Sequence, residues 1–208
     1  MLKMKRLVDI VVASIAILLF SPVFLFVAYK VRKHLGSPIF FYQERPGKDG
    51  KIFKMIKFRS MKNALDQQGN LLPDEQRITP FGQKLRATTL DEMPQLFNVL
   101  KGDMSIVGPR PQMTEFLEHY TVDQMRRHEV KPGMTGLAQV SGRNSLSWEE
   151  KFDLDVQYVE NHNILLDFKI MVKTVDVMLK REGINAPDQA VGASRFTGSD
   201  SQSNSIVK

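Results

Sequence analysis

The chain begins with a long hydrophobic segment, and polar and apolar positions are mixed along the rest of it. Residues 10–28 form a run of 19 positions without a charged side chain, and about 20 apolar residues are enough to cross a bilayer as a helix. A signal peptide would have a shorter apolar core and small residues at its far end. Here the far end holds Phe24, Phe26 and Tyr29. The pattern therefore predicts a membrane-associated helix.

Two features of this segment argue against a simple span. Ser21-Pro22 lies inside it, and proline removes a backbone donor and clashes with the carbonyl of Leu18. Basic residues flank both ends, within 3–6 and 30–33, and such flanks tend to stay cytoplasmic. We expect residues 1–33 to form a re-entrant helix that breaks near Ser21 and Pro22, with the Ser21 hydroxyl bonding a freed carbonyl. A kinked full span and a buried helix of a soluble core are the alternatives.

The remaining pattern predicts an α-rich α/β domain over residues 34–185. Short apolar runs at 39–42 and 52–59, separated by turn residues 44–50, predict a β-hairpin. Thr79-Pro80 is typical of a helix start. Other segments are expected as a loop at 63–78, helices at 91–100, 112–128 and 147–181 (broken near 161–163), and an irregular or strand-like stretch at 132–142. Residues 186–208 are rich in Ser, Gly, Asp and Asn, which predicts a flexible polar tail.

Charge and composition narrow the class of partner. Lys plus Arg exceed Asp plus Glu by 29 − 23 = 6, and the isoelectric point is about 9.5. This balance suits phosphate-bearing partners such as nucleic acid, anionic lipid or a nucleotide. The absence of cysteine excludes disulfides, cysteine zinc sites, iron–sulfur clusters and thiol nucleophiles. The chain also lacks the glycine-rich sequences of P-loop and Rossmann sites.

The sequence around Asp91 and Glu92 has two interpretations. Thr89 and Glu92 have the spacing of a capping box, which would explain both residues without any function. Alternatively, carboxylates at a helix N-terminus are stabilised in their ionised form, as a nucleophile or metal ligand requires. Adjacent helical side chains point about 100° apart, so the two do not flank a glycosidic bond as a hydrolase pair would. Different roles for Asp91 and Glu92 are expected.

Basic residues supply candidate phosphate ligands. Lys57 and Arg59 share one face if both lie on a strand, as a solvated edge or as a phosphate clamp. In Gly108-Pro109-Arg110-Pro111, two prolines fix the backbone around one arginine, which favours bidentate phosphate recognition.

Two other charged clusters are interpreted as solvated surface. Asp153-Leu154-Asp155 has the Asp-x-Asp spacing of metal-dependent sugar transferases but lies in a helical context. Arg126-Arg127-His128 is a basic cluster, interpreted as solvated or lipid-facing helix surface.

Taken in order, these motifs resemble those of one family, the bacterial sugar transferases, also called monotopic polyprenyl-phosphate phosphoglycosyl transferases. The chain is most similar to their minimal members, typified by the bacillosamine-phosphate transferase, over about residues 3–182. Leu137 departs from the pattern, since the family more often has Trp there. The matching motifs are Lys5-Arg6…Asp9, Ser21-Pro22, Glu44-Arg45-Pro46-Gly47, Lys57-Phe58-Arg59-Ser60-Met61, the run from Asp91 to Ser105, Gly108-Pro109-Arg110-Pro111, Lys131-Pro132-Gly133-Met134-Thr135-Gly136 and Gln139-Val140-Ser141-Gly142-Arg143-Asn144.

The resemblance implies a fold and a reaction. It implies a re-entrant membrane helix with a compact cytosolic domain, membrane-surface helices, and a location on the cytoplasmic face of the bacterial inner membrane. The reaction would be transfer of a sugar 1-phosphate from a UDP-sugar to polyprenyl (undecaprenyl) phosphate, with release of UMP, as the first membrane step of glycoconjugate synthesis. Asp91 would be the nucleophile, forming a covalent phosphosugar intermediate, and Glu92 its acid/base partner, with Mg²⁺ at the dyad.

Further residues follow from the same resemblance and from the charge of the substrates. Asp167 matches an acidic position of functional importance in the family, and Arg143 belongs to one of its motifs. The diphosphate needs cations around it, for which we expect Arg110, Lys57, Arg59 and Arg86. Membrane lipid is a further expected partner and nucleic acid is not. The sugar, the pathway and the oligomeric state, a homo-oligomer included, stay open.

Three competing functions remain. A glycosyl transferase that used Asp153 and Asp155 would release UDP instead of UMP. A non-enzymatic membrane-surface module would bind anionic lipid without turnover. An RNA-binding protein would not need residues 1–30 and would show a steep salt dependence.

Overall fold

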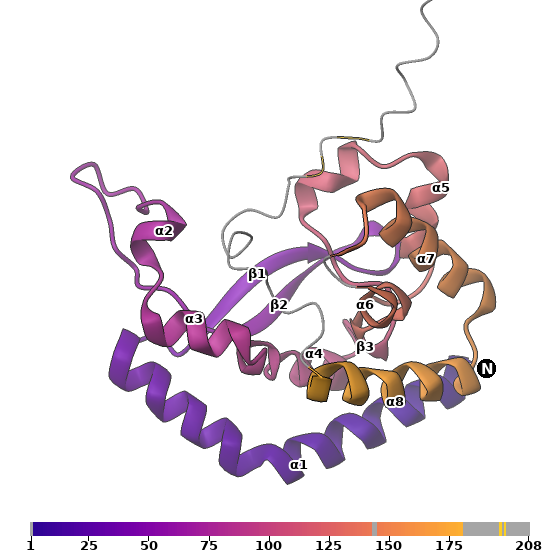
Figure 1. The fold of residues 1–208 in the computed structure, drawn as a ribbon, viewed down its shortest axis with the longest axis horizontal. Helices are drawn as coiled ribbons and strands as arrows, with labels where there is room; N and C mark the ends of the chain where they lie inside the picture. The colour runs from indigo at the N-terminus through magenta and orange to yellow at the C-terminus, as the bar shows by residue number, and fades with distance from the viewer. Residues whose placement is uncertain (1, 143–144, 181–195, 197, 199–208) are drawn as a thin grey trace, which may run out of the picture.

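A long N-terminal helix lies beneath a body of short helices and two small sheets (Figure 1). The computed structural model describes residues 2–142, 145–180, 196 and 198. In chain order the elements are α1 (Leu2–Leu35), β1 (Phe40–Pro46), β2 (Ile52–Phe58), α2 (Asp74–Arg77), α3 (Pro80–Ala87), α4 (Gln95–Lys101), β3 (Ser105–Val107), α5 (Val122–Met125), β4 (Gly133–Thr135), α6 (Leu137–Ser141), α7 (Trp148–Asn161) and α8 (Ile164–Lys180). The expected α-rich α/β fold is consistent with this arrangement.

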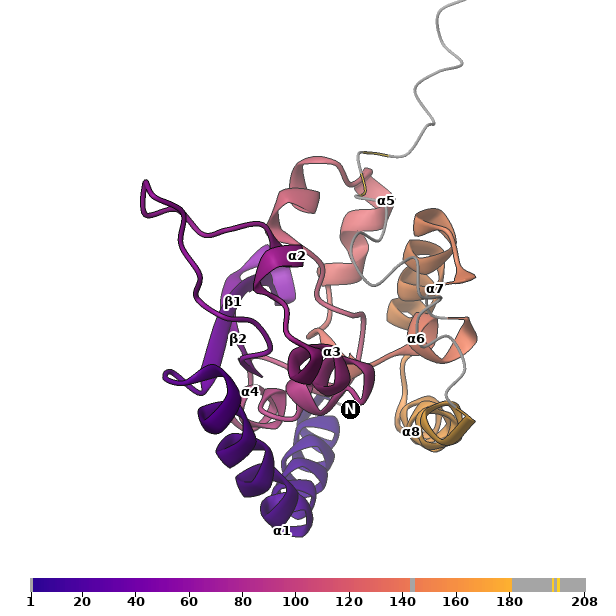
Figure 2. The ribbon, with the colours of Figure 1, turned by 60° about the vertical axis from the view of Figure 1, so that its left-hand side comes forward.

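Helix α1 bends in its middle but does not break (Figures 1 and 2). Pro22 lies inside it, and proline is the usual cause of a sharp helix bend. The Ser21 hydroxyl donates a hydrogen bond to the carbonyl of Leu18 at 2.9 Å, the bond anticipated from the sequence. Residues 1–33 were expected as two helices around a break. The structure instead has one continuous helix, because the hydroxyl replaces part of the hydrogen bonding that proline removes.

Both arms of α1 pack against the same body. On the first arm, Ala13 is fully buried against β2 and α4, in a cluster with Met55 and Leu96. On the second arm, Val27 and Val31 are buried against Phe58 and Leu85. The stretch between the arms exposes large apolar side chains: Leu18, Leu19, Phe20, Val23, Leu25 and Phe26. By length and composition α1 could cross a membrane, and its exposed middle is consistent with membrane association.

Arginines tie the two ends of α1 to the body. The Arg6 guanidinium donates to the carbonyls of Val99 and Leu100 at 2.5 and 2.7 Å, which satisfies the C-terminal end of α4. At the other end, Arg59 donates to the carbonyls of Leu35 and Ser37. Because its first and last turns are both held this way, both ends of α1 are fixed to the same body, and the bend lies between them.

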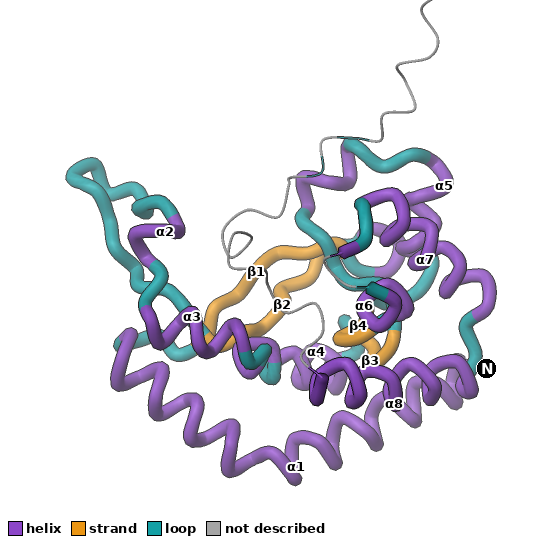
Figure 3. Tube along the Cα trace, in the orientation of Figure 1, coloured by secondary structure: helices purple, strands orange, loops and turns teal. Residues whose placement is uncertain are grey.

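The two sheets are small and come from different parts of the chain (Figure 3). Strands β1 and β2 form the predicted antiparallel hairpin, with Phe41 opposite Lys57 and Arg45 opposite Phe53. Strands β3 and β4 pair in parallel. A Cβ on Gly133 would lie 2.1 Å from the amide nitrogen of Gly108. The two backbone segments therefore approach this closely only because both residues are glycine. This contact fixes where the Pro109-Arg110 segment begins.

Several local predictions are confirmed. The Thr79 hydroxyl accepts from the Gly82 amide at 3.1 Å and begins α3. Helices α7 and α8 meet near Asn163, whose side chain caps α8 by accepting from the Leu166 amide.

The expected helix at 112–128 is instead a series of short pieces: 3₁₀ turns at Thr114–Glu118 and Arg126–His128 with α5 between them. Most of the expected tail, 186–208, lies outside the described residues, although Phe196 packs among Phe116, Tyr120 and Phe152.

Candidate active site

Asp91 and Glu92 lie in a 3₁₀ turn, Leu90–Glu92, between α3 and α4. The turn is preceded by Thr89 in the left-handed conformation, with φ of 55°, which is rare for a β-branched residue. The capping-box interpretation is wrong: the Thr89 hydroxyl donates to the carbonyl of Thr88 and makes no cap hydrogen bond. The helix expected at 91–100 begins later, at Gln95. The strained Thr89 turns the chain so that both carboxylates face the body.

Glu92 is held by two cations from distant parts of the chain. Arg110 donates to both of its carboxylate oxygens, at 2.6 and 3.1 Å. Lys57, from β2, donates to the oxygen Oε1 at 3.0 Å. Burial alone would raise the pKa of Glu92, but these two cations lower it well below its usual range. Glu92 is therefore ionised at any physiological pH.

Asp91 differs sharply from its neighbour. It is 8% exposed, and no hydrogen bond or ion pair joins its side chain to another residue in the described part of the chain. Burial and the charge of Glu92 raise its pKa to about 6, against the opposing effect of Lys57, Arg86 and Arg110. Asp91 is thus a buried carboxylate that is largely ionised above pH 6 and that forms no hydrogen bond or ion pair with a described side chain. These are the properties of a nucleophile.

The remaining predicted phosphate ligands divide into two groups. Arg86 lies close enough to Asp91 to lower the pKa of that carboxyl, and its Nε donates to Ser60 at 3.0 Å. Arg59 was expected to share a face with Lys57 and does not reach the site. Strand β2 ends at Phe58, so the two-residue alternation stops there and Arg59 turns to the end of α1. Arg59 therefore bonds the end of α1, whereas Lys57 reaches the dyad.

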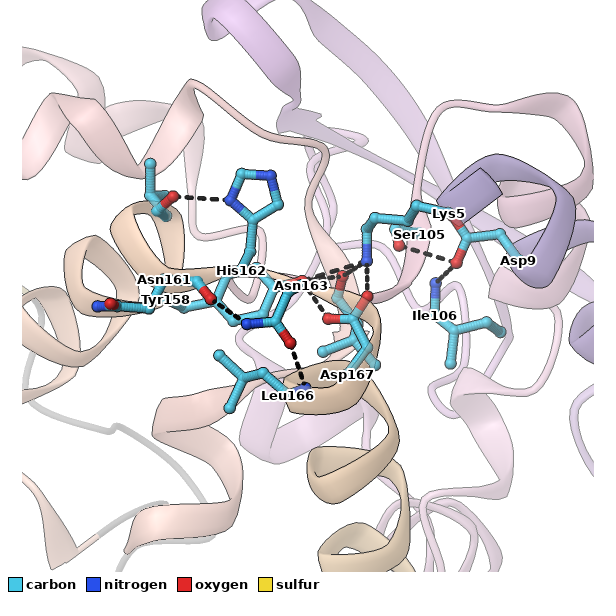
Figure 4. Close-up of polar contacts among 12 residues, drawn as sticks. Lys5, Asp9, Ser105, Ile106, Tyr158, Asn161, His162, Asn163, Leu166 and Asp167 are labelled. Carbon is cyan, nitrogen blue, oxygen red and sulfur yellow. Dashed lines mark hydrogen bonds and ion pairs between the residues drawn. The ribbon is translucent and has the colours of Figure 1, made fainter. Parts of the chain in front are cut away.

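Asp167 belongs to a second carboxylate cluster, shown in Figure 4. Its carboxylate is 2.5 Å from the Lys5 ammonium and accepts from the Tyr158 hydroxyl at 2.6 Å. Lys5 also donates to the Val107 carbonyl, at 3.1 Å. One helical turn on, Asp9 accepts from the Ser105 hydroxyl and the Ile106 amide, both at 2.9 Å. Within the described residues, no hydrogen bond or ion pair joins this cluster to Asp91 or Glu92. It holds the start of α1 against β3 and α8.

A buried ion pair lies behind Arg110. Arg127 is 2% exposed and pairs with Asp155 at 2.6 Å, and it also donates to the backbone carbonyl of Arg110 at 2.7 Å. The interpretation of Asp155, Arg127 and His128 as solvated surface is therefore wrong, since all three are buried. The partners Arg127 and Asp155 are 28 positions apart, so helix periodicity could not pair them. The pair fixes the backbone from which the Arg110 side chain extends.

Other functional candidates are placed as follows. Arg143 lies outside the described residues, and Ser21 and Pro22 belong to the bend of α1. Sequence reasoning gave no individual roles to Lys5, Arg6 and Asp9. The sequence did contain an indication of these residues. Lys5 and Asp9 are four positions apart at the start of an apolar helix, where charged side chains need partners.

Within the described residues, no group of three His, Cys, Asp or Glu side chains is placed to hold a metal. Mg²⁺ is commonly bound by one or two carboxylates together with substrate phosphates. The unpartnered Asp91 carboxylate beside Glu92 fits that requirement, with the substrate supplying the remaining oxygens.

The sequence matches the family model described as "Bacterial sugar transferase" over residues 1–181. The chain therefore belongs to the bacterial sugar transferase family and is a transferase, as the motifs indicated.

Particular relatives refine this assignment. The chain is 52% identical over 196 residues to the "Uncharacterized sugar transferase EpsL" of Bacillus subtilis, covering 94% of this chain and 96% of that protein. It is 41% identical to the "Undecaprenyl-phosphate galactose phosphotransferase" of Salmonella typhimurium, covering 86% of this chain but 41% of that protein. It is also 41% identical to the "UDP-glucose:undecaprenyl-phosphate glucose-1-phosphate transferase" of Klebsiella pneumoniae, covering 82% and 39%. The chain thus spans less than half of these two longer relatives.

Proposed function

We propose that the protein transfers a sugar 1-phosphate from a UDP-sugar to undecaprenyl phosphate and releases UMP. The observation that carries the proposal is the dyad: a buried, unpartnered Asp91 beside a Glu92 locked in its ionised form by Lys57 and Arg110. The names of two relatives, from Salmonella typhimurium and Klebsiella pneumoniae, include undecaprenyl phosphate. The reaction would be the first membrane step in building a polysaccharide or other glycoconjugate.

The chemistry has two displacement steps at one phosphorus atom. The Asp91 carboxylate attacks the phosphorus that carries the sugar, and the bond to the bridging oxygen breaks so that UMP leaves with the electron pair. A phosphate oxygen of undecaprenyl phosphate then attacks the same phosphorus, and Asp91 leaves as a free carboxylate. The product is the diphosphate-linked sugar, with no net oxidation or reduction. Because no described residue forms a hydrogen bond or ion pair with the Asp91 side chain, the carboxylate is free to make the first bond.

The surrounding residues reduce the repulsion between a carboxylate and an anionic diphosphate. Lys57, Arg86 and Arg110 place positive charge around the dyad, which stabilises charge on the transferring phosphoryl group. Glu92 keeps Lys57 and Arg110 in position. Asp91 and Glu92 would hold Mg²⁺ together with the diphosphate, and the ion would neutralise phosphate charge when bound.

The shape of α1 supports a re-entrant position in the membrane. Arg6 and Arg59 fix the two ends of the helix to one body, so a span would require that body to lie on both sides of the bilayer. With the body on the cytoplasmic face of the inner membrane, the exposed apolar middle of α1 would enter one leaflet. Helix α8 would lie on the surface through its exposed Leu165, Phe168 and Val172. A soluble UDP-sugar and a lipid-borne phosphate would then meet at the leaflet boundary.

The deciding experiment measures intact-protein mass after incubation with a panel of UDP-sugars and Mg²⁺, without lipid acceptor. Free UMP is quantified in the same samples. We expect a sugar-phosphate adduct with an equal amount of UMP, discharged by undecaprenyl phosphate and absent in Asp91→Asn. Arg126→Gln, which alters an exposed surface ion-pair cluster, is the matched control and should form the adduct normally. Release of UDP instead of UMP would overturn the proposal.

The structure weakens the competing hypothesis of a glycosyl transferase that uses Asp153 and Asp155. Asp155 is buried and bonded to Arg127, so it could bind a metal only by giving up that pair. Among the described acidic residues, the Asp91–Glu92 pair is therefore the better candidate for catalysis.

A further inference from the structure

Arg45, at the end of β1, faces the same side of the hairpin as Lys57. Residues directly opposite each other in an antiparallel pair project to one face, and so do residues two apart along a strand. Arg45 is opposite Phe53 and Gln43 is opposite Met55. Lys57 follows Phe53 and Met55 at two-residue intervals, so it shares their face. The hairpin therefore presents Arg45 and Lys57 together, and Lys57 reaches Glu92.

The Arg45 side chain is buried and poorly satisfied. The residue is 9% exposed, and its side chain donates to a neutral partner, the side-chain oxygen of Gln43, at 2.9 Å. Its Nε–H is buried without a hydrogen-bond partner. In the described part of the chain no carboxylate lies within ion-pair distance of it. A buried cation is unfavourable unless an anion compensates it, and here none of the described side chains does so.

Its surroundings indicate what kind of anion is missing. Arg45 lies within electrostatic range of Arg110 and Glu92; burial and the like charge of Arg110 lower the pKa of Arg45 to about 10, which leaves it charged at neutral pH. Arg110 and Lys57 are both paired with Glu92, whereas Arg45 is not. Arg45, Lys57, Arg86 and Arg110 against Asp91 and Glu92 give 4 − 2 = +2 when all are ionised. The site is short of negative charge beside Arg45.

We propose that Arg45 is a substrate-binding residue, and that its guanidinium and that of Arg110 hold a phosphate oxyanion of the substrate between them. A guanidinium presents several N–H donors in a fork that matches phosphate oxygens, and the unpartnered Nε–H is one such donor. The inference rests on the proposed function, because it names a further residue for the same phosphate chemistry. The oxyanion belongs either to the diphosphate of the UDP-sugar or to the acceptor lipid phosphate.

The test compares Arg45→Gln, Arg45→Lys and the control Arg126→Gln as full-length proteins in the same detergent. UDP binding is measured by titration calorimetry, and KM and kcat are then measured separately for the UDP-sugar and for undecaprenyl phosphate. We expect Arg45→Gln to weaken UDP binding about tenfold, which is the size of one lost charged hydrogen bond. KM for the UDP-sugar should rise, and kcat should change less than about threefold. Arg45→Lys should recover part of the loss, and Arg126→Gln should match the wild type.

Each outcome decides a different question. If KM for undecaprenyl phosphate rises and UDP binding is unchanged, the residue binds the lipid phosphate and the proposal stands with that source. Unchanged UDP binding with both KM values unchanged overturns it. So does a fall in kcat and melting temperature that Arg45→Lys shares fully, because that pattern marks a structural role. A wild-type protein that binds UDP but releases no UMP from any UDP-sugar would contradict the proposed function while leaving the Arg45 comparison intact.

Discussion

The described residues of the molecule include two buried carboxylate clusters that face lysine, and they are built in opposite ways. In the Asp167 cluster, Lys5 and Tyr158 occupy the carboxylate oxygens, and the neighbouring Asp9 accepts from Ser105 and Ile106. In the Asp91 cluster, Glu92 is bonded to Lys57 and Arg110, whereas among the described residues the Asp91 side chain has no hydrogen-bond or ion-pair partner and the Arg45 Nε–H is unpaired. Thr89, just before the dyad, is in the left-handed conformation. The first cluster is complete within the folded chain. The second is complete only with a bound anion or cation.

The comparison shows how burial alone fails to identify a catalytic residue. Asp91 and Asp167 are almost equally buried, at 8% and 6% exposure. What separates them is whether the fold supplies the partners that a buried charge needs. Unsatisfied groups and backbone strain persist in a stable fold where a ligand or a reaction uses them. The following predictions test that distinction, from the largest expected effect to the smallest.

Asp91→Asn should abolish transfer while leaving the fold more stable. Loss of a nucleophile typically reduces kcat by a factor of roughly a thousand or more, and removing the repulsion with Glu92 favours the folded state. Initial rates of UMP release and thermal unfolding in the same detergent measure the two effects. A variant that lost both activity and stability would contradict the comparison, because Asp91 would then be a structural residue.

Asp167→Leu should destabilise the protein by about 3–5 kcal/mol, since it leaves the Lys5 ammonium facing an apolar side chain. The double variant Lys5→Met with Asp167→Leu removes both charges and should recover most of the loss. Chemical unfolding monitored by the fluorescence of Trp148 measures each free energy of unfolding. If the double variant is as unstable as the single one, the cluster does more than compensate charge.

The stability advantage of Asp91→Asn should depend on pH. The folded pKa of Asp91 is raised to about 6 from the ordinary 3.8, so the folded state retains a proton that the unfolded state has lost. The free energy of unfolding contributed by Asp91 therefore falls as pH rises from 4 to 6. The difference between variant and wild type should be near zero at pH 4 and roughly 2–3 kcal/mol above pH 6.5. A pH-independent difference would mean that Asp91 titrates normally.

Thr89→Gly should have the smallest effect, a gain in stability of at most about 1 kcal/mol. Glycine relieves the cost of a left-handed β-branched residue but loses more chain entropy on folding. Thr88→Gly, where the backbone is right-handed, is the matched control and should lose stability by a similar amount. Thermal unfolding of both variants checks the sign.

Local features of the fold followed from the sequence, and contacts between distant segments did not. The hairpin, the Thr79 cap and the division between α7 and α8 depend on residues within a few positions of one another. The errors came from longer distances. Glu92 is held by Lys57 and Arg110, which are 35 and 18 positions away, and these contacts override a capping box. Arg59 was misplaced because the second strand of the hairpin was expected to reach residue 59, whereas β2 ends at Phe58.

The candidate site brings together residues that the sequence predicted, while the catalytic role of each one stays a prediction. Asp91, Glu92, Lys57 and Arg110 are brought together as expected, and Arg86 lies near Asp91. Arg45 was noted only within the Glu44-Arg45-Pro46-Gly47 motif and given no role, because its relation to Lys57 depends on the register of the hairpin, which places Arg45 opposite Phe53. Register is set by the turn and by the packed face of a hairpin, and neither could be fixed from composition.

The continuity of α1 through its bend has a consequence for how this helix can change in evolution. Each helical residue adds a rotation of about 100°, and both arms must present particular side chains, Ala13 on one and Val27 on the other, to the same body. A single inserted residue between them would rotate the second arm away from its contacts. Seven residues, close to two full turns, would lengthen the exposed apolar middle of the helix and leave both faces nearly in phase. The length of the bent helix is therefore adjustable in whole turns and not residue by residue.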